Sequence, residues 1–431
     1  MTVATLREQS YWSATAPAPQ ITERTWPQRV DVAIVGGGYT GLAAARELAR
    51  RGAHVAVLEA YTFGWGASSR NGGMALTGLK ESMSATIRRF GTETARALFR
   101  TSLEAVAYVE RLVHEEEIDC EFARCGHLEL AWKPSHFEAL QREAELLERV
   151  FGHHVHVIPR SALHTETATD YYHGALLDEA SGGLHPAKYA SGLATAADRA
   201  GAWLFERCRV NAIERTNGAF ALQTTRGTLC ANAVLIATNG YTSSLTPEIQ
   251  RRVIPIGSYI IATDPLPAEL AQAISPKRRM MYDTKHFLFY YRLSSDNRMI
   301  FGGRAAFFPE GPDTVRKSAA ILHKSMSQVY PQLAHARVEY AWGGTLAFTF
   351  DLIPHAGQTR DGLYYALGCG GHGVALLSYL GACMGCHIAG EKVDNPFFTL
   401  PFPTAPLGLY DGRPWFLPLV GAYYRLRDWL A

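Results

Sequence analysis

The sequence predicts an α/β protein in which a parallel α/β unit is interrupted by an inserted antiparallel sheet. Three observations lead to this prediction. Residues 30–59 read as strand, glycine-rich turn, helix and strand, and two further small-residue turns follow strands at 237–240 and 368–373. Between those turns, residues 251–349 contain strands with alternating side chains and short connections, a pattern typical of antiparallel pairing.

Glycines at defined positions organise the first unit. The apolar run 30–35 is followed by Gly36-Gly37-Gly38-Tyr39-Thr40-Gly41, and apolar residues then recur at helical spacing until Gly52. Gly36 permits a tight turn, Gly38 lets a pyrophosphate approach the backbone, and Gly41 lets the helix pack closely on the strand. The second strand stops at Glu59, where a carboxylate would accept hydrogen bonds from a ribose. The unit therefore predicts a dinucleotide site for FAD or NAD rather than NADP.

Composition limits the class of protein. The chain has 431 residues, 47% of them hydrophobic, and a net charge of +2, so nothing indicates a nucleic-acid partner. No apolar run is long enough to span a bilayer, and residues 1–20 lack the apolar core of a signal peptide. Seven scattered cysteines suggest reduced thiols, so a cytoplasmic location is expected. His153, His154 and His156 have no acid or cysteine at ligand spacing, and no metal site is expected.

The remaining elements follow from the same patterns. The loop 60–74 is rich in glycine and small polar residues, and it is expected to contact the ligand. Helices are expected over 92–118, 135–150, from Pro186 to near Gly201, 314–330, 374–389 and 423–429, and strands over 128–132, 219–224, 228–236, 254–263, 287–293, 299–303, 337–345 and 362–367. Residues 1–29 are expected to form an ordered arm on the surface, and 393–431 a polar and aromatic tail.

Motifs along most of the chain then suggest a family. They are VGGGYTGL at 35–42, FGWGASSRNGG at 63–73, SGGLHPAKYASGL at 181–193, ATNGY at 237–241, MYDTKHFLFYYRLS at 281–294, FGG at 301–303, WGGTLAFTFDLIPHAG at 342–357, GGHGVALLSYLGA at 370–382 and YYRLRDWL at 423–430. In this order they resemble the D-amino-acid-oxidase superfamily of FAD-dependent amine oxidoreductases. The γ-glutamylputrescine oxidoreductase-like members are the most similar.

The resemblance implies a division into domains. A discontinuous, Rossmann-like FAD-binding domain would comprise 30–85, 151–250 and 350–392. A substrate domain with an antiparallel sheet, formed by 86–150 and 251–349, would close over the isoalloxazine ring.

The resemblance also implies which residues hold FAD. Gly36, Gly38 and Gly41 would hold the pyrophosphate and Glu59 the ribose, while the helix that starts at 371–374 would direct its dipole at the pyrimidine end of the ring, where negative charge develops. The expected cofactor residues are Gly36, Gly38, Tyr39, Thr40, Gly41, Glu59, Ala60, Gly66, Ala67, Ser68, Arg70, Asn71, Gly72, Gly73, Met74, Val210, Thr238, Asn239, Gly240, Gly344, Gly371, His372, Gly373 and Val374. Some relatives attach FAD through a cysteine near 342–349 or a histidine in the loop after the ribose acid. Neither is present here, so non-covalent FAD is expected.

The implied reaction is the oxidation of an amine at CH–NH. A hydride passes to flavin N5, and the imine is hydrolysed to an aldehyde or keto acid plus an amine or ammonia. The expected catalytic residues are His372 as base or hydrogen-bonding group, Arg304 as an anion binder and Tyr290; Arg292, Tyr259 and His286 are further candidates for the substrate face. Since Tyr290 and Arg292 are two apart on a strand, they are expected to share one face.

Several alternatives stay open at this point. A γ-glutamylputrescine-like amine is the first substrate candidate, and a glycine- or sarcosine-type amino acid or an aminophosphonate is the second. The strand 299–303 lacks the lysine that sarcosine-oxidase-type relatives carry, so the electron acceptor is either O2 or another compound. An NAD-dependent dehydrogenase would leave the second and third glycine-rich turns unexplained, and a non-catalytic flavoprotein would need no enclosed ring. The sequence gives no indication of the oligomeric state.

Overall fold

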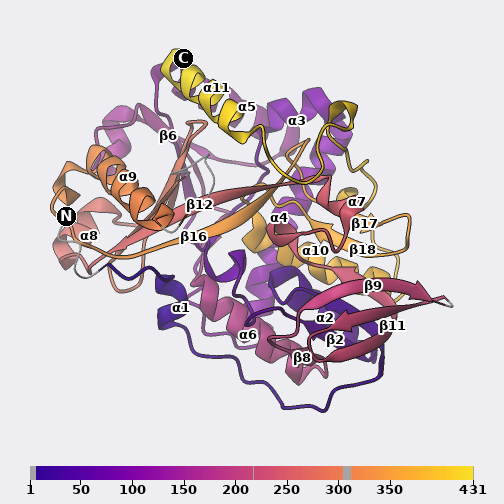
Figure 1. Ribbon diagram of the computed structural model, residues 1–431. Helices are drawn as coiled ribbons and strands as arrows, with labels where there is room; N and C mark the ends of the chain where they lie inside the picture. Colours follow the sequence, from indigo (N-terminus) through magenta and orange to yellow (C-terminus); the bar gives the residue numbers. More distant parts are fainter. Residues whose placement is uncertain (1–5, 217, 304–310, 312, 431) are drawn as a thin grey trace.

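Two sheets form the framework of the protein. A computed structural model describes residues 6–216, 218–303, 311 and 313–430. Figure 1 shows one sheet with its helices at the lower right, the second sheet at the upper left, and the long strands β12 (Val253–Thr263) and β16 (Val338–Thr349) running between them. The predicted combination of a parallel α/β unit and an inserted sheet is therefore present.

The first sheet is the predicted parallel unit. Its strand order is β17-β18-β11-β1-β2-β8, and all neighbours in it are parallel except β17 and β18. The strands are β1 (Arg29–Val35), β2 (Val55–Leu58), β8 (Trp203–Phe205), β11 (Gly227–Ile236), β17 (His355–Gln358) and β18 (Tyr364–Leu367). Strand β10 (Ala219–Thr224) extends the sheet as an antiparallel neighbour of β11, and β9 (Val210–Thr216) pairs antiparallel with β10. Strand β17 was not predicted, because its four residues show no clear alternation.

Helices α2 (Tyr39–Arg50) and α10 (Gly373–Ile388) lie against each other beside this sheet. A Cβ on Gly381 would lie 2.3 Å from the Thr40 carbonyl oxygen, so glycine is what allows the two backbones to approach. Helix α10 is apolar around most of its circumference, as expected of a helix covered on all sides. Helices α4 (Thr92–Glu115) and α6 (Pro186–Arg199) complete this layer.

The second sheet has the order β16-β12-β15-β14-β13-β4-β6-β5. Its further strands are β4 (His127–Leu130), β5 (His156–Pro159), β6 (Gly174–Asp178), β13 (Met280–Asp283), β14 (Phe289–Leu293) and β15 (Met299–Gly303). Neighbouring strands are antiparallel, as predicted, except β13 and β4, which are parallel. No short turn connects these two strands, so no hairpin sets their relative direction.

The two faces of the second sheet differ in character. One face packs against α8 (Ala268–Ile274) and α9 (Thr314–Val329) in an apolar core that includes Leu128, Tyr259 and Tyr291. Because side chains alternate along a strand, their neighbours His127, Ser258 and Tyr290 lie on the opposite face. That face is turned towards the first sheet and its glycine-rich turns.

Strands β5 and β6 bear on the division into domains. They lie within 151–250, which the sequence analysis assigns to the FAD-binding domain, yet both belong to the second sheet through β4. We propose that the boundary lies after Asp178 rather than at residue 151.

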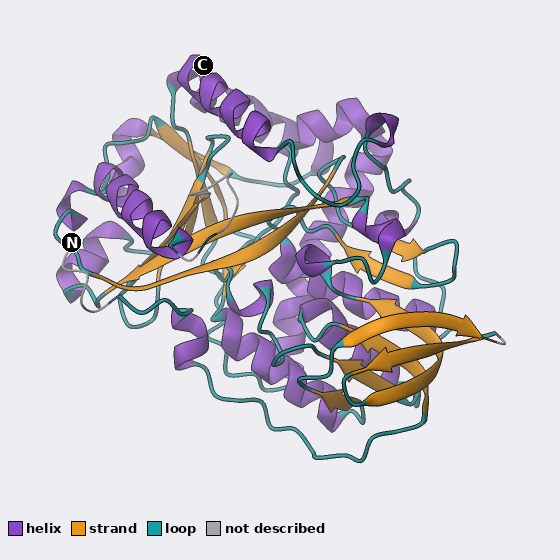
Figure 2. Cartoon of the chain, in the orientation of Figure 1, coloured by secondary structure: helices purple, strands orange, loops and turns teal. Residues whose placement is uncertain are grey.

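The remaining elements lie outside the two large sheets, with β3 and β7 forming a two-stranded sheet of their own. Figure 2 shows the C-terminal helix at the top, far from the strongly twisted strands at the lower right. These remaining elements are α1 (Tyr11–Thr15), β3 (Met74–Ala75), α3 (Met83–Phe90), α5 (Pro134–Leu146), β7 (Gly182–Gly183), α7 (Pro247–Gln250) and α11 (Leu417–Leu430), the last longer than predicted. Within the described ranges, none of the helices combines the length and apolar character that crossing a bilayer requires.

The N-terminal arm is more deeply integrated than a surface tail. Trp12 in α1 is 1% exposed, and its indole N–H donates to the Asn71 carbonyl oxygen at 2.9 Å. Ser10 donates to the Ser69 carbonyl oxygen at 2.8 Å. The expectation of an arm lying on the surface is therefore wrong for this segment, because two aromatic residues, Tyr11 and Trp12, fill a hydrophobic cluster with Trp342.

Candidate cofactor and substrate site

The N-terminus of α2 forms one wall of a cavity of about 290 Å³. Gly38 is the N-cap and has no side chain that could cap the helix, while Gly36 has a φ of +109°, which only glycine adopts readily. A Cβ on Gly41 would lie 2.0 Å from the Gly36 carbonyl oxygen. This turn therefore places helix-terminal N–H groups against the cavity, an arrangement that suits a phosphate.

Glu59 lines the same cavity with two of its acceptor positions already used. Its carboxylate accepts the N–H of Gly37 at 2.8 Å and the N–H of Tyr61 at 2.9 Å. Burial raises the pKa of Glu59, and these two backbone donors oppose that rise. Since a carboxylate can accept about four hydrogen bonds, the remaining positions suit the hydroxyls of a ribose.

Most of the predicted cofactor residues come together in this cavity or in the larger one beside it. The first is lined by Gly36, Gly38, Tyr39, Thr40, Glu59, Ala60, Gly66, Ala67, Ser68, Asn71, Val210, Thr238, Asn239, Gly371, Gly373 and Val374, and the second adds Arg70, Gly72, Met74, Gly344 and His372. Gly41, Gly73 and Gly240 line neither. Gly41 packs against Gly36, the Gly73 carbonyl oxygen accepts a hydrogen bond from Arg292, and Gly240 lies against the backbone of β16.

Hydrogen bonds hold the loop between the two cavities in place. The Asn71 amide donates to the Ala67 carbonyl oxygen at 2.9 Å and accepts the N–H of Gly73 at 2.7 Å. Arg70 donates to the Gly343 carbonyl oxygen at 3.1 Å and covers the Trp65 ring at 4.6 Å. Arg70 thus ties the loop to β16, so its main visible role is to position the loop.

The second cavity has a volume of about 870 Å³ and shares Ala67, Asn71, Gly371 and Val374 with the first. The Tyr290 hydroxyl lies in it and is 2.9 Å from Ser258 Oγ. Burial raises the pKa of Tyr290 to about 12, so its hydroxyl stays protonated near neutral pH.

His372 is the N-cap of α10 and lines the second cavity. Its Nδ1 is buried, and no hydrogen-bond partner for it lies among the described residues. Burial, together with the charge of Lys80, lowers the pKa of His372 to about 3. The imidazole is therefore neutral at physiological pH, which favours the hydrogen-bonding role over that of a proton-storing base.

The low pKa of His372 has a consequence for stability in acid. Below about pH 6.5 the unfolded chain binds a proton at this histidine and the native state does not, so stability falls as the pH drops towards 3. We expect the free energy of unfolding to fall by about 2 kcal/mol less in His372→Gln than in the parent protein between pH 7 and pH 5. Denaturant unfolding in saturating FAD at both pH values measures this, with exposed His114→Gln as control. Equal losses in His372→Gln and the parent would contradict it.

Three candidates for the substrate face are not confirmed as cavity residues. Tyr259 lies on the opposite face of the sheet, in the core with α9, so that prediction is wrong. Arg292 shares the face of Tyr290, as predicted, but it is 7% exposed and donates to the Gly73 and Leu184 carbonyl oxygens at 3.2 and 2.9 Å. Arg304 lies outside the described residues. His286 does line the cavity.

The pattern of motifs agrees with a comparison against known families. A family model described as FAD dependent oxidoreductase, the DAO family, matches residues 31–385. The chain belongs to this family. The predicted cofactor, FAD, and the predicted relationship to D-amino-acid-oxidase-like enzymes are thereby confirmed.

Individual members of the DAO family match over nearly the whole chain. The chain is 33% identical over 404 residues to γ-glutamylputrescine oxidoreductase of Escherichia coli (strain K12), with 93% of each chain covered. It is 34% identical over 422 residues to the probable oxidoreductase OrdL of Rhizobium meliloti (strain 1021), with 97% of each chain covered. The solved structure of glycine oxidase from Geobacillus kaustophilus matches with a TM-score of 0.74 at 26% identity, covering 88% of this chain and 99% of that one.

The residues of this DAO-family protein fit FAD. The cavity beside α2 offers a glycine cradle that a Cβ would fill, and the N-terminus of α10 reaches both cavities through Gly371 and Val374. Two helix N-termini thus face two adjoining cavities with shared lining residues, an arrangement that suits a ligand with a pyrophosphate at one point and an electron-rich ring at another. FAD bound there supplies a two-electron acceptor next to the larger cavity.

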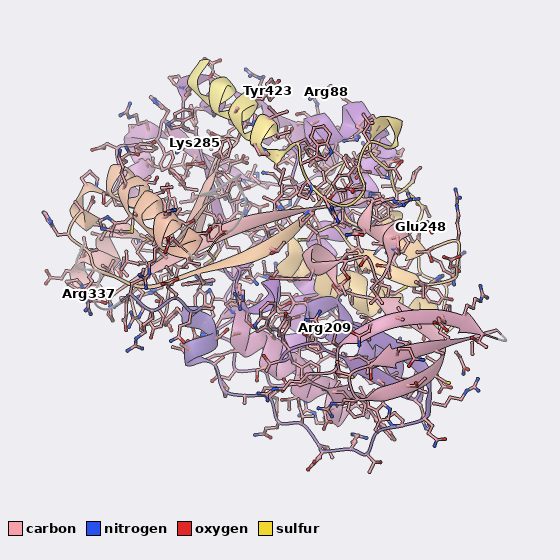
Figure 3. The ribbon with its side chains drawn as sticks, in the orientation of Figure 1. Arg88, Arg209, Glu248, Lys285, Arg337 and Tyr423 are labelled. Atoms are coloured by element: carbon pink, nitrogen blue, oxygen red, sulfur yellow. The ribbon has the colours of Figure 1, made fainter. Side chains whose placement is uncertain are left out.

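Sequence reasoning missed several lining residues of the DAO-family site. In the first cavity, Tyr61 and Trp65 stack with ring centroids 3.9 Å apart, and Arg209 covers Tyr61. Figure 3 shows Arg209 near the twisted strands of the first sheet and Lys285 near the second sheet. In the second cavity, the missed polar residues include Lys80, His127, Glu129, Glu143, Asp178, Ser258 and Tyr282. Only the paired aromatic residues 61 and 65 could have been suspected from the loop sequence.

Arg292 gives a testable distinction between a structural role and substrate binding. We expect Arg292→Met to lower the free energy of unfolding by about 3 kcal/mol, because two buried carbonyl oxygens lose a charged donor. Arg96 is exposed, pairs with Glu93 and donates to the Val150 carbonyl oxygen at 3.0 Å, so the same substitution there should cost less than about 1 kcal/mol. Denaturant unfolding measures both. A stable Arg292→Met protein with a raised KM would instead assign the residue to substrate binding.

Proposed function

We propose that the protein oxidises an amine at CH–NH with bound FAD as the hydride acceptor, and that its substrate is an elongated amine resembling γ-glutamylputrescine. The observation that carries this is the 870 Å³ cavity that adjoins the cofactor cavity and shares Ala67, Asn71, Gly371 and Val374 with it. Part of it would take the isoalloxazine ring, and the remainder is deep enough for a substrate longer than glycine. The whole-length similarity to γ-glutamylputrescine oxidoreductase supports the same substrate class.

The described residues suggest how the cavity would prepare the substrate. An amine gives up hydride as the neutral base, so a protein that favours the neutral form raises the reactive fraction. His372, neutral because of burial, adds no positive charge of its own and presents a ring nitrogen to the cavity. The Tyr290 hydroxyl, held by Ser258, can orient the substrate from the floor of the cavity. An anion-binding role for Arg304 stays a prediction from the sequence.

Anaerobic reduction of the flavin tests the proposal. Holoenzyme mixed with a panel of amines should lose its flavin absorbance near 450 nm with γ-glutamylputrescine and other long primary amines. Preferential reduction by glycine or sarcosine would favour the second candidate, which the fold of glycine oxidase supports. If no amine bleaches the flavin, the proposed reaction is wrong. Adding O2 to the reduced enzyme then separates an oxidase from a dehydrogenase.

We also propose that the flavin is held without a covalent bond, since segment 342–349 contains no cysteine and loop 60–74 no histidine. Acid precipitation of the holoenzyme should release all of the flavin into the supernatant. Yellow colour that stays with the precipitate would contradict this.

A further inference from the structure

Glu129 lies on the floor of the large cavity. In β4, Leu128 and Leu130 are buried in the core on the α9 side of the sheet. Alternation therefore turns Glu129 to the opposite face, where it lines the cavity with intermediate exposure. A carboxylate on the sheet therefore faces the cavity.

Glu129 differs from the other acids that line this cavity. Glu143 accepts the N–H of Ser84 at 3.3 Å, Asp178 accepts the Thr77 hydroxyl at 2.6 Å, and Asp283 is 3.1 Å from Lys285. For Glu129, the described part of the chain provides neither a hydrogen bond nor an ion pair. An enclosed carboxylate without a partner is costly, and a bound cation is the partner that offsets this cost most effectively.

The register of the sheet fixes the position of Glu129 relative to the reacting end of the site. Tyr282 of β13 is the cross-strand neighbour of Tyr290 on one side and of Glu129 on the other. The three residues therefore form a row across three adjacent strands on one face. Because neighbouring strands are about 4.8 Å apart, the backbone of Glu129 is roughly 10 Å from that of Tyr290.

We propose that Glu129 binds a second cationic nitrogen of the substrate, about two strand spacings from the nitrogen that is oxidised. This inference rests on the proposed function and narrows it. The substrate class is an elongated amine that carries an ammonium group at its far end, such as an α,ω-diamine or a derivative with a free amino group there. Small amino acids would not reach Glu129 from the flavin end.

The charges around Glu129 make this binding dependent on pH. Burial and the neighbouring Glu143 raise the pKa of Glu129 to about 7, while Lys80 opposes the rise. The other titratable or charged residues that line this cavity are Arg70, Glu81, His127, His136, Asp178, Tyr282, Asp283, Lys285, His286, Tyr290 and His372. A protonated Glu129 cannot form an ion pair. Binding of the distal ammonium should therefore weaken as the pH falls below about 7, and deprotonation should accompany binding.

Equilibrium binding to the dithionite-reduced holoenzyme tests the inference separately from turnover, because the reduced flavin cannot accept hydride. The probes are α,ω-diamines and n-alkyl monoamines with the same numbers of carbons, titrated calorimetrically under anaerobic conditions. The parent protein should bind the best diamine about tenfold or more tightly than its matched monoamine. Glu129→Gln should abolish this preference and its loss below pH 7, while its affinity for the monoamine stays within about threefold.

Glu143→Gln is the matched control. It removes a negative charge from the same cavity but keeps an oxygen for the N–H of Ser84, so it should retain most of the preference for diamines. Equal affinities for diamine and monoamine in the parent protein, or an unchanged preference in Glu129→Gln, would overturn the inference. If no amine reduces the flavin, the proposed oxidation is wrong. The role of Glu129 is still decided separately, by comparing the binding of diamines and monoamines.

Discussion

Gly41→Ala is expected to purify with little or no FAD and to unfold more easily than the parent protein. The new methyl group would lie 2.0 Å from the Gly36 carbonyl oxygen and 3.1 Å from Ile34 Cγ2, so α2 must move away from β1. We expect a loss of about 3 kcal/mol in the free energy of unfolding, because overpacking against backbone cannot relax through a side-chain rotation. The ratio of flavin absorbance to protein and the denaturant midpoint measure the two effects.

Gly52→Ala serves as the control for this substitution. Gly52 ends α2 with a φ of +83°, and a Cβ there would meet nothing within 4 Å. Gly52→Ala should lower the free energy of unfolding by only about 1 kcal/mol, because alanine is strained at a positive φ, and the variant protein should retain its flavin. If Gly41→Ala keeps a full complement of FAD, the close approach of α2 to the strand is not what holds the cofactor.

Gly302→Ala is expected to reduce kcat/KM by about 100-fold while leaving the flavin content unchanged. Gly302 pairs with Tyr290 across β15 and β14, and a Cβ there would lie 2.3 Å from the tyrosine ring. The Tyr290 ring would have to move, which would break the hydrogen bond between its hydroxyl and Ser258 Oγ and change the shape of the substrate cavity. A displacement of about 1 Å at a reacting site is enough for an effect of this size.

Gly303→Ala separates this effect from general damage to β15. The neighbouring glycine faces the opposite side, where its Cβ would lie 3.1 Å from Phe289 in the core. It should lower stability slightly and leave the rate of flavin reduction within about threefold of the parent value. Similar losses of activity in both variants would mean that the strand, rather than the Tyr290 position, is responsible.

The fold could be predicted where local chemistry determines it. The turn at 36–41 and the acid at Glu59 identify a βαβ unit because each glycine has a steric reason. Strands β13 and β17 were missed because each has four residues without strong alternation, and their pairing is what makes them strands. The parallel pairing of β13 with β4 depends on contacts between distant segments, which no local pattern reports.

The candidate site could likewise be predicted only where a local sequence pattern determines it. Alternation predicts that Tyr290 and Arg292 share a face, and they do. It does not say which face meets the cofactor, and Tyr259 was placed on the wrong one. Glu129 gave no signal at all, since an acid in a short strand usually faces water and only the surrounding sheet shows that this one faces an enclosed cavity.

The contacts of α1 affect how the protein should be trimmed for study. The family match begins at residue 31, so a domain definition based on it would remove Ser10 and Trp12. Those two side chains donate hydrogen bonds to the carbonyl oxygens of Ser69 and Asn71, in the loop that borders both cavities. A shortened expression clone that starts at the first strand would thus free the flavin loop on one side, and its weak colour would be mistaken for an intrinsic property of the enzyme.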